Sequence, residues 1–337
     1  MKKFAIIILM ILTGIMYAKS AELPDISDST EFYMISCEPG QEAYTLFGHS
    51  AIRVVDKTQN LDVAFNWGVF SFEAPNFIGR FVVGKTDYEL AVWHTELFLA
   101  EYRERGSAVH QCHINLDSLE KRRLWTMLCK NYEPQNRVYR YNFIYDNCAT
   151  RVVDMILASY DSIDAPSFEL PSKSYRELVN SYTHPDNFLA LGIDLVFGKL
   201  ADDIIPKRKS TTFPLQAMTL LSETSVKRDG QNEPILTDQT YLCNSDKSGA
   251  WKNYSKGKEA LMCLLPLAIM ALLIFMFFWH KRYHYKKILA EIVLWVLFLL
   301  SLLILFLEFF TTHPLVDYNL NILWCSPLAG VLAVVLL

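Results

Sequence analysis

The sequence predicts an α+β fold for an exported domain, followed by apolar helices that cross a membrane. Segments with strand patterns come first and segments with helix patterns follow, which argues against a parallel sheet built from β–α–β units. Two long apolar segments lie in the last third of the chain. The 337 residues suffice for one or two domains, and the net charge of −4 gives no reason to expect nucleic acid as a partner.

The N-terminus has the layout of a secretory signal peptide. Two lysines precede an apolar run over residues 4–15, and the small residues of Ala18-Lys19-Ser20 follow it. We therefore expect residues 1–20 to be a signal peptide that is cleaved after Ser20. An uncleaved anchor is the alternative, although the apolar run is short for a membrane span. In either case the chain from residue 21 to about 258 is exported.

Residues 259–337 are expected to form a membrane domain. Apolar segments at about 260–279 and 288–310 are long enough to cross a bilayer as helices. A third, at 322–337, is too short for a full span, which leaves a truncated sequence or a shallow helix as explanations. The basic residues of 280–287 indicate a cytoplasmic loop by the positive-inside rule. The exported domain is thus expected on the outer face of a cytoplasmic membrane.

Six segments of the exported domain have strand patterns. They are rich in β-branched and aromatic residues, and several are bounded by Pro or Gly. In one of them Phe65 and Trp67 share a face, while Ala64 and Asn66 lie on the other. The predicted strands cover residues 32–38, 49–56, 63–67, 81–83, 88–93 and 109–116.

Helix signals follow the predicted strands. Asp117 and Glu120 have the spacing of a capping box at the start of a helix that Pro134 ends. A second helix begins at Cys148, and it is apolar on more than one side, as buried helices are. Shorter helices are expected over residues 172–180 and 186–198.

These signals define the domain boundaries that we expect. Residues 21–200 form the exported α+β domain. Residues 201–258 form an irregular cap or linker, because the part from 222 onward is rich in polar residues and glycine.

Cys148 is the best candidate for a nucleophile. It follows Asp146 and Asn147, two residue types that favour the N-cap of a helix. Backbone N–H groups at a helix start stabilise a thiolate, and they can also receive an oxyanion during acyl transfer. A buried structural cysteine is the alternative interpretation.

His49 is the candidate base, because it opens an apolar strand far from Cys148 in sequence, and a strand and a helix can bring the two together. Thiol and imidazole are the groups that a thioester-forming enzyme needs. A third group must orient the imidazole through its other nitrogen. Asn66 is the best candidate for it, and Asp62 and Tyr44 are weaker ones.

The remaining cysteines and histidines give weaker signals. Cys37 is the rival nucleophile, but it ends a strand with no helix behind it, and it either lies near the site or pairs with Cys112 or Cys129. His110 and Cys112 lie close to His113, which faces the other side of a strand. We therefore expect neither a metal site nor a cofactor.

The motifs resemble those of the Lnb family of bacterial lipoprotein N-acylation transferases, with coverage of about residues 25–190. Thr312-His313-Pro314-Leu315 and Asn319-Leu320-Asn321 are similar in the membrane part. The matching blocks of the exported domain are Cys37-Glu38-Pro39-Gly40, Leu46 to Val54 around Gly48-His49-Ser50, Phe65-Asn66-Trp67-Gly68, and Tyr141 to Arg151 around Asn147-Cys148.

The resemblance implies a circularly permuted papain-like (NlpC/P60-type) domain in which the histidine precedes the cysteine, as in lecithin retinol acyltransferases. It implies transfer of the sn-2 acyl chain of a diacylglyceryl lipoprotein to that lipoprotein's N-terminal cysteine amine, which leaves a lyso-form lipoprotein. It also implies a periplasmic catalytic domain on the inner membrane of a bacterium, with lipoproteins and membrane lipid as partners. This chain has fewer apolar segments than family members usually carry after the soluble domain.

We expect His49 to take the thiol proton of Cys148 while Asn66 holds the imidazole ring. His313, Asn319 and Asn321 return to the outer interface, where either lipid contact or helix capping and turn formation accounts for them. The expected substrate-binding residues are Tyr44, Asn147, Arg53, His313, Asn319 and Asn321.

Two other classes of function use the same sequence features. A membrane-tethered cysteine peptidase or amidase acting on the cell wall would use the same cysteine and histidine. A non-catalytic membrane receptor would bind its ligand equally well with Cys148 changed to alanine.

Overall fold

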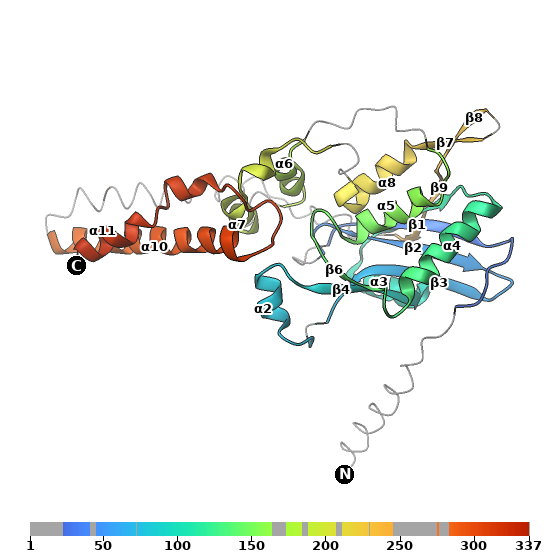
Figure 1. The fold of residues 1–337 in the computed structure, drawn as a ribbon, viewed down its shortest axis with the longest axis horizontal. Helices are drawn as coiled ribbons and strands as arrows, with labels where there is room; N and C mark the ends of the chain where they lie inside the picture. Colours follow the sequence, from blue (N-terminus) through green and yellow to red (C-terminus); the bar gives the residue numbers. More distant parts are fainter. Residues whose placement is uncertain are drawn as a thin grey trace, which may run out of the picture.

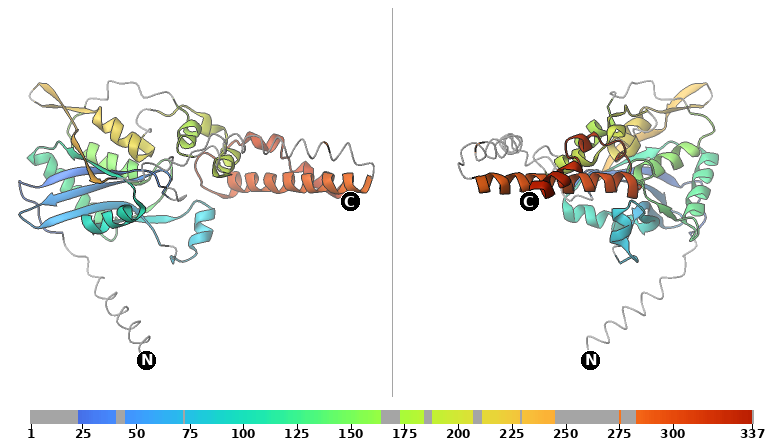
Figure 2. Two further views of the ribbon diagram at one scale, coloured as in Figure 1. Left: turned by 180° about the vertical axis from the view of Figure 1, so that it is seen from behind. Right: turned by 60° about the vertical axis from the view of Figure 1, so that its left-hand side comes forward.

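The computed structural model contains an antiparallel β-sheet domain with helices on both faces and a helical arm that extends to one side (Figure 1). The predicted α+β class is therefore confirmed. The arm is formed by the C-terminal helices, and the views of Figure 2 show that it projects along the long axis of the molecule. The structure describes residues 23–40, 45–71, 73–163, 173–183, 188–206, 211–228, 230–244, 275 and 283–336.

The main sheet has seven strands in the order β6-β4-β3-β2-β1-β5-β9, and every neighbouring pair is antiparallel. Strands β7 and β8 form a separate hairpin. The strands of the main sheet are β1 (Glu31–Cys37), β2 (His49–Asp56), β3 (Leu61–Val69), β4 (Asp87–His94), β5 (Val109–Ile114), β6 (Val138–Arg140) and β9 (Leu236–Cys243), and the hairpin consists of β7 (Ser225–Arg228) and β8 (Gln231–Pro234).

The central strands are buried on both faces, because helices cover each side of the sheet. One face packs Ile52 and Phe65 against α4 (Ser118–Tyr132), α5 (Cys148–Ala158) and α8 (Pro214–Ser222). The other face packs Ala51 and Ala64 against α3 (Thr95–Arg105). The small alanines let α3 approach the sheet closely. The predicted capping box of α4 is present: Asp117 accepts from Glu120 N–H, and the Glu120 carboxylate accepts from Asp117 N–H.

Two predictions of local structure are wrong. Residues 81–83 were expected to form a strand, but 81 and 82 end the helix α2 (Phe77–Val82). β-Branched residues favour strands where they pack on a half-buried sheet, and this segment loops out between β3 and β4 without a sheet neighbour. The described part of 201–258 is not an irregular linker, because it forms α8 and β7 to β9. The polar pattern of β9 arises because it is an edge strand whose middle is exposed.

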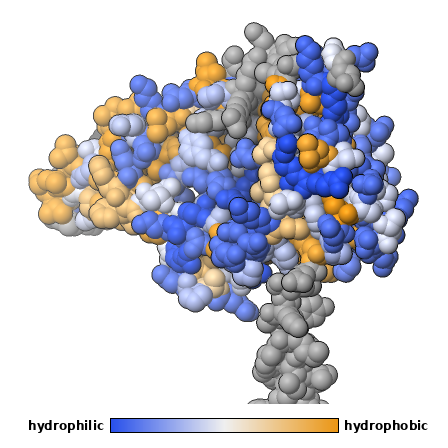
Figure 3. Space-filling model, turned by 45° about the vertical axis from the view of Figure 1, so that its right-hand side comes forward, coloured by the Kyte–Doolittle hydropathy of each residue, from blue (hydrophilic) through white to orange (hydrophobic). Residues whose placement is uncertain are grey.

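The membrane part is described from Tyr283 onward. The helix α10 (Tyr283–Phe310) is long and apolar enough to cross a membrane, as predicted for 288–310: its stretch Tyr285–Phe310 has 26 residues, and the mean hydropathy of an 18-residue window within it is 2.9. The third apolar segment forms a 3-10 turn, η3 (Leu320–Leu323), and α11 (Leu328–Leu336), which packs along α10. Apolar side chains gather on this arm, whereas the sheet domain is mostly hydrophilic (Figure 3). The predicted signal peptide and almost all of the predicted span 260–279 lie outside the described residues.

The connection between α10 and α11 is fastened to the sheet domain at two places. At one, Thr312 N–H donates to the Val83 carbonyl over 3.0 Å, next to α2. At the other, Gly198 N–H donates to the Leu315 carbonyl over 2.7 Å, and a Cβ on Gly198 would lie 1.8 Å from the Asp317 carbonyl oxygen. Only glycine permits that approach. Gly198 lies among the helices α6 (Tyr175–Asn180), α7 (Phe188–Val196) and η1 (Lys199–Asp202).

Candidate active site

Cys148 occupies the first position of α5, as predicted, and the Asn147 side chain holds it there. The Asn147 amide oxygen accepts from Ala149 N–H over 2.9 Å and from Thr150 N–H over 3.1 Å. Its amide nitrogen donates to the carbonyls of Phe143 and Thr212, each over 2.8 Å. The amide is buried, and both its oxygen and its nitrogen are used within the protein. Asn147 therefore positions the Cys148 thiol, and a direct contact with substrate stays a prediction.

A closed turn precedes Cys148 and fixes the direction of α5. Asn142 and Asp146 exchange backbone hydrogen bonds of 2.9 and 3.1 Å. The Asp146 carboxylate accepts two hydrogen bonds, over 2.6 and 2.8 Å, from Arg151, one turn into the helix. The Arg151 guanidinium lies 3.6 Å from the centroid of the Tyr139 ring. The local sequence thus sets the helix start without any help from the membrane part.

His49 is the first residue of β2 and faces Asn66 of β3. The His49 Nε2 and Asn66 Oδ1 atoms are 2.5 Å apart, and the Asn66 side chain is buried. An amide oxygen can only accept, so Nε2 must carry the proton, and Nδ1 is left as the nitrogen that serves the Cys148 thiol. Asp62, a weaker candidate for this role, instead pairs with Arg53.

The charges of the pair stabilise one another. Burial opposes the charged forms of both groups, but the nearby imidazolium of His49 and its hydrogen bond lower the pKa of the Cys148 thiol below its usual 9.0. The N–H groups of Ser50 and Ala149 act in the same direction. Burial likewise opposes the imidazolium, yet the Cys148 thiolate and the Asn66 hydrogen bond raise the pKa of His49 above 6.5. Both shifts favour the charged form of the group concerned, so the arrangement favours a thiolate–imidazolium pair.

The other described cysteines of the sheet domain lack this activation. Burial raises the pKa of Cys37 well above its usual range and raises those of Cys112 and Cys129 to about 11. All six described cysteines are free, so the predicted pairing of Cys37 with Cys112 or Cys129 is wrong. Cys37 lies opposite His49 in the β1–β2 register but is fully buried. No group of three or more His, Cys, Asp or Glu residues in the described ranges could hold a metal ion.

Gly68 lies beside the pair and leaves room of about methyl size there. It lies at a register shift between Trp67 and Val69 and has φ of +91°, a conformation that favours glycine. A Cβ there would lie 3.8 Å from the Cys148 Cβ, 3.9 Å from the His49 Cε1 and 3.9 Å from the Tyr139 hydroxyl. Three polar groups thus surround a position without a side chain.

Sequence reasoning gave no role to Gly68 or Tyr139. The Tyr139 hydroxyl is buried and has no hydrogen-bond partner within the described ranges. Burial and the Cys148 charge raise its pKa well above the usual value, so it stays a neutral donor. The alternation of Tyr139 and Tyr141 around Arg140 was the available signal, since it places both rings on one face of a strand.

Two family models match this chain. The model of the Lnb N-terminal periplasmic domain matches residues 25–181, and that of the Lnb transmembrane domain matches residues 255–337. The chain belongs to the Lnb family. It is thus a bacterial membrane protein with a periplasmic domain, and His49, Asn66 and Cys148 all lie in the Lnb periplasmic domain. No curated protein and no solved structure matches it.

The other residues expected to bind substrate are not gathered at the thiol of this Lnb protein. Arg53 pairs with Asp62 and donates to Gln111 over 2.9 Å. His313 bonds the Val82 carbonyl over 3.1 Å, and Asn319 and Asn321 both donate to the Leu195 carbonyl. These contacts give structural roles to all four residues, and contact with lipid stays a prediction. Tyr44 lies outside the described residues.

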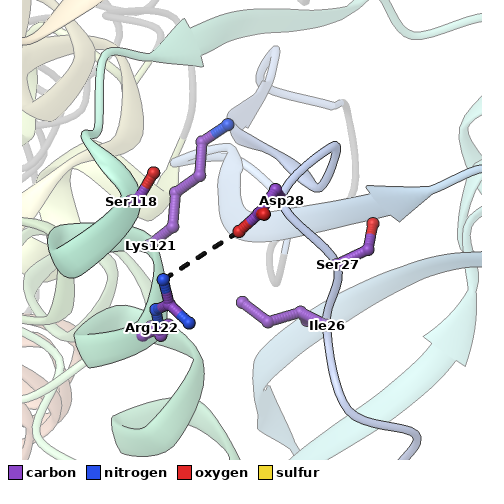
Figure 4. A pocket seen from close by; sticks show the side chains of 6 residues that line it. All are labelled: Ile26, Ser27, Asp28, Ser118, Lys121 and Arg122. Atoms are coloured by element: carbon purple, nitrogen blue, oxygen red, sulfur yellow. Dashed lines mark ion pairs between the residues drawn. The ribbon is translucent and has the colours of Figure 1, made fainter.

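A small pocket between the N-terminal segment and the start of α4 shares no residue with the thiol site (Figure 4). Asp28 and Arg122 face each other across it at 3.9 Å. It contains no nucleophile, so we assign it no part in the chemistry. Its lining residues are Ile26, Ser27, Asp28, Ser118, Lys121 and Arg122.

Replacing Asn66 with alanine tests its support of the imidazolium in the Lnb protein. Without the accepting amide the pKa of His49 falls, so the imidazolium that stabilises the thiolate is lost at a lower pH. Alkylation of Cys148 by iodoacetamide, followed by mass spectrometry of its peptide, is then expected to start rising only at a higher pH than in the native protein. Asp62→Asn is the matched control and keeps the native profile. Identical profiles for Asn66→Ala and the native protein would refute the assignment.

Changing Gly68 to alanine tests the open space. The new methyl group makes ordinary contacts but occupies the room beside the thiol. We therefore expect a bulky maleimide to alkylate Cys148 at least about tenfold more slowly. The physical cause is overpacking around the bound reagent, which costs ~1–3 kcal/mol. Iodoacetamide is expected to react nearly as before. Gly230→Ala is the control, since Gly230 has φ of +80° but nothing within 4 Å of its added Cβ. An equal fall in the rate of maleimide alkylation with both variants would mean that backbone strain alone is responsible.

Proposed function

We propose that this Lnb protein is a membrane-anchored thiol acyltransferase. It moves the sn-2 acyl chain of a diacylglyceryl lipoprotein to the amine of that lipoprotein's N-terminal cysteine and leaves a lyso-form lipoprotein. The observation that carries the proposal is the Cys148–His49 pair, oriented by Asn66, in a periplasmic domain fastened to the end of a membrane-spanning helix. The order of histidine strand before cysteine helix supports a circularly permuted papain-like domain.

In the first half-reaction Cys148 takes the acyl chain. His49 Nδ1 holds the proton of the thiol, and the sulfur attacks the carbonyl carbon of the sn-2 ester. The negative oxygen of the tetrahedral intermediate accepts from the Cys148 N–H at the start of α5, since the Ala149 and Thr150 N–H groups already donate to Asn147 Oδ1. When the intermediate collapses, the carbon–oxygen bond to glycerol breaks and the leaving alkoxide takes the proton from His49. The products are a thioester on Cys148 and a lyso-glyceryl group.

In the second half-reaction the free α-amine of the lipoprotein resolves the thioester. The amine nitrogen attacks the thioester carbonyl, His49 accepts one of its protons, and the thiolate of Cys148 leaves. An amide bond forms, and the enzyme returns to its starting state. The reaction balances with these residues alone and requires neither metal nor cofactor. Because amine and ester belong to one anchored molecule, their effective concentration at the site is high, which favours aminolysis over hydrolysis.

The membrane attachment supports a lipid-anchored substrate over a soluble one. The segment between α10 and α11 is bonded to α2 and to the α7–η1 region. These two attachments, on different parts of the sheet domain, hold it in one orientation above the end of α10. A substrate anchored in the same bilayer can reach such a site by diffusing in two dimensions.

Fragmentation mass spectrometry of a model lipoprotein tests the proposal. The full chain in liposomes is incubated with a diacylglyceryl peptide whose sn-1 and sn-2 chains differ in length. Intramolecular transfer leaves the total mass unchanged, so the expected result is a blocked amine carrying the sn-2 chain and a free sn-2 hydroxyl. Cys148→Ala is expected to lower the rate by roughly 10³-fold or more.

Cys129→Ala is the matched control, because Cys129 is partly exposed but its thiol is not activated. This variant is expected to keep the native rate. Release of the sn-2 chain as free fatty acid would identify a hydrolase instead. An unmodified lipoprotein together with Cys148-dependent cleavage of cell-wall peptides would identify an amidase. Binding without turnover, equal in Cys148→Ala, would identify a receptor.

A further inference from the structure

The helix α2 exposes apolar side chains that the sheet domain does not cover. It lies in the connection from β3 to β4 and buries Phe77, while Ile78 is 75% exposed and Phe81 and Val82 are also exposed. Nothing in the sheet domain requires large apolar groups on this outward side. An exposed apolar face of this kind marks contact with another apolar phase.

Hydrogen bonds fix α2 to the end of the membrane-spanning helix. Thr312, two residues after the end of α10, donates its N–H to the Val83 carbonyl over 3.0 Å and its hydroxyl to the Gly84 carbonyl over 2.9 Å. The His313 ring donates to the Val82 carbonyl over 3.1 Å. Gly84 has φ of +71°, and a Cβ there would lie 2.9 Å from the His313 nitrogen. The joint is therefore closely fitted, and α2 cannot move away from α10 without breaking it.

The position of the joint determines what covers α2. Apart from Glu308, the last turns of α10 are apolar as far as Phe310, so the boundary of the bilayer lies within a few residues of Thr312. Figure 1 shows α2 level with this end of α10 along the long axis of the molecule. Lys85, just beyond α2, is exposed at the same level, where a cation meets lipid phosphates. The lipid surface is thus continuous with the exposed face.

We propose that α2 is a membrane-interface helix that inserts Ile78 and Phe81 into the outer surface of the bilayer. The partner is lipid, and Lys85 lies at the phosphate level. Insertion adds a second point of membrane contact beside α10. It therefore fixes how far the thiol site stands from the lipid surface.

An aromatic row connects α2 with the thiol site. Successive ring centroids are 6.1, 5.4, 4.9 and 4.2 Å apart, and the last ring belongs to the same buried cluster as Cys148. Resting on the proposed function, this row joins the inserted face of α2 by apolar packing to the region of the thiol that receives the acyl chain. The rings are those of Phe81, Phe77, Phe70, Tyr88 and Tyr141.

Nitroxide labels on the full chain test the insertion without reference to activity. The label is placed at Ile78→Cys in a background in which Cys129 and Cys148 are both alanine, and the control label is at Leu119→Cys on α4, where the native side chain is 60% exposed. In liposomes of phosphatidylethanolamine and phosphatidylglycerol, we expect the residue 78 label to be accessible to oxygen and protected from an aqueous nickel chelate. The residue 119 label is expected to show the opposite.

Two outcomes would overturn the proposal. One is an Ile78 label as accessible to the nickel chelate as the Leu119 label. The other is protection that disappears as the protein is diluted in lipid, because a second copy of the chain would then cover α2. If the native protein shows no transfer activity while the label at residue 78 is protected from the nickel chelate, only the proposed function is refuted.

A second pair of variants tests the link to catalysis. Ile78→Glu with Phe81→Glu is expected to lower transfer to a bilayer-embedded lipopeptide at least about tenfold, because charge on the inserted face opposes lipid contact. The iodoacetamide reactivity of Cys148 is expected to stay native, which shows that the sheet domain is folded. Leu119→Glu serves as the control for an added surface charge. Unchanged transfer by the double variant would contradict the role of α2 in delivering the acyl chain.

Discussion

The buried amide of Asn147 is the interaction on which the thiol site depends. Its oxygen caps α5, and its nitrogen ties the cap to the carbonyls of Phe143 and Thr212. A helix start left without partners at this depth would cost free energy for each unsatisfied N–H group. Because one side chain satisfies the helix and bridges two other segments, the position of Cys148 is fixed by the fold of the whole domain and not by the helix alone.

The charge pair built on this cap is stable only because its polar surroundings are preorganised. Burial by itself would keep Cys148 and His49 neutral. Each of the two groups chiefly supports the charge of the other, while the Asn66 amide adds to the support of the imidazolium and the N–H groups of Ser50 and Ala149 add to that of the thiolate. Cys37 is fully buried, and its hydrogen bond with Tyr102 does not offset that burial, so its pKa stays above the usual range. The opposite pKa directions of the two cysteines therefore follow from the His49 imidazolium and the two N–H groups that lie beside Cys148.

Local patterns predicted the parts of the site that local chemistry determines. The start of α5 at Cys148, the first residue of β2 at His49 and the capping box at Asp117 could all be located from the sequence, since each depends on residues within one turn or one strand. The position of Gly68 beside the thiol depends on a register shift between two strands, and the alternation of apolar and polar residues along a strand does not reveal such a shift. The helical form of 81–83 and the pairing of β9 likewise depend on which distant segments lie beside them.

The attachment of the sheet domain to the membrane part completes the constraint on the site. The segment after α10 bonds to α2 through Thr312 and to the α7–η1 region through Leu315 and Asn319, so rotation of the domain on its stalk would break hydrogen bonds at both places. A single flexible linker would leave the thiol free to sample distances from the bilayer that no anchored ester can reach. Two attachments hold the thiol at one fixed distance from the bilayer surface. A reaction between a thiol and a lipid ester requires such a fixed distance.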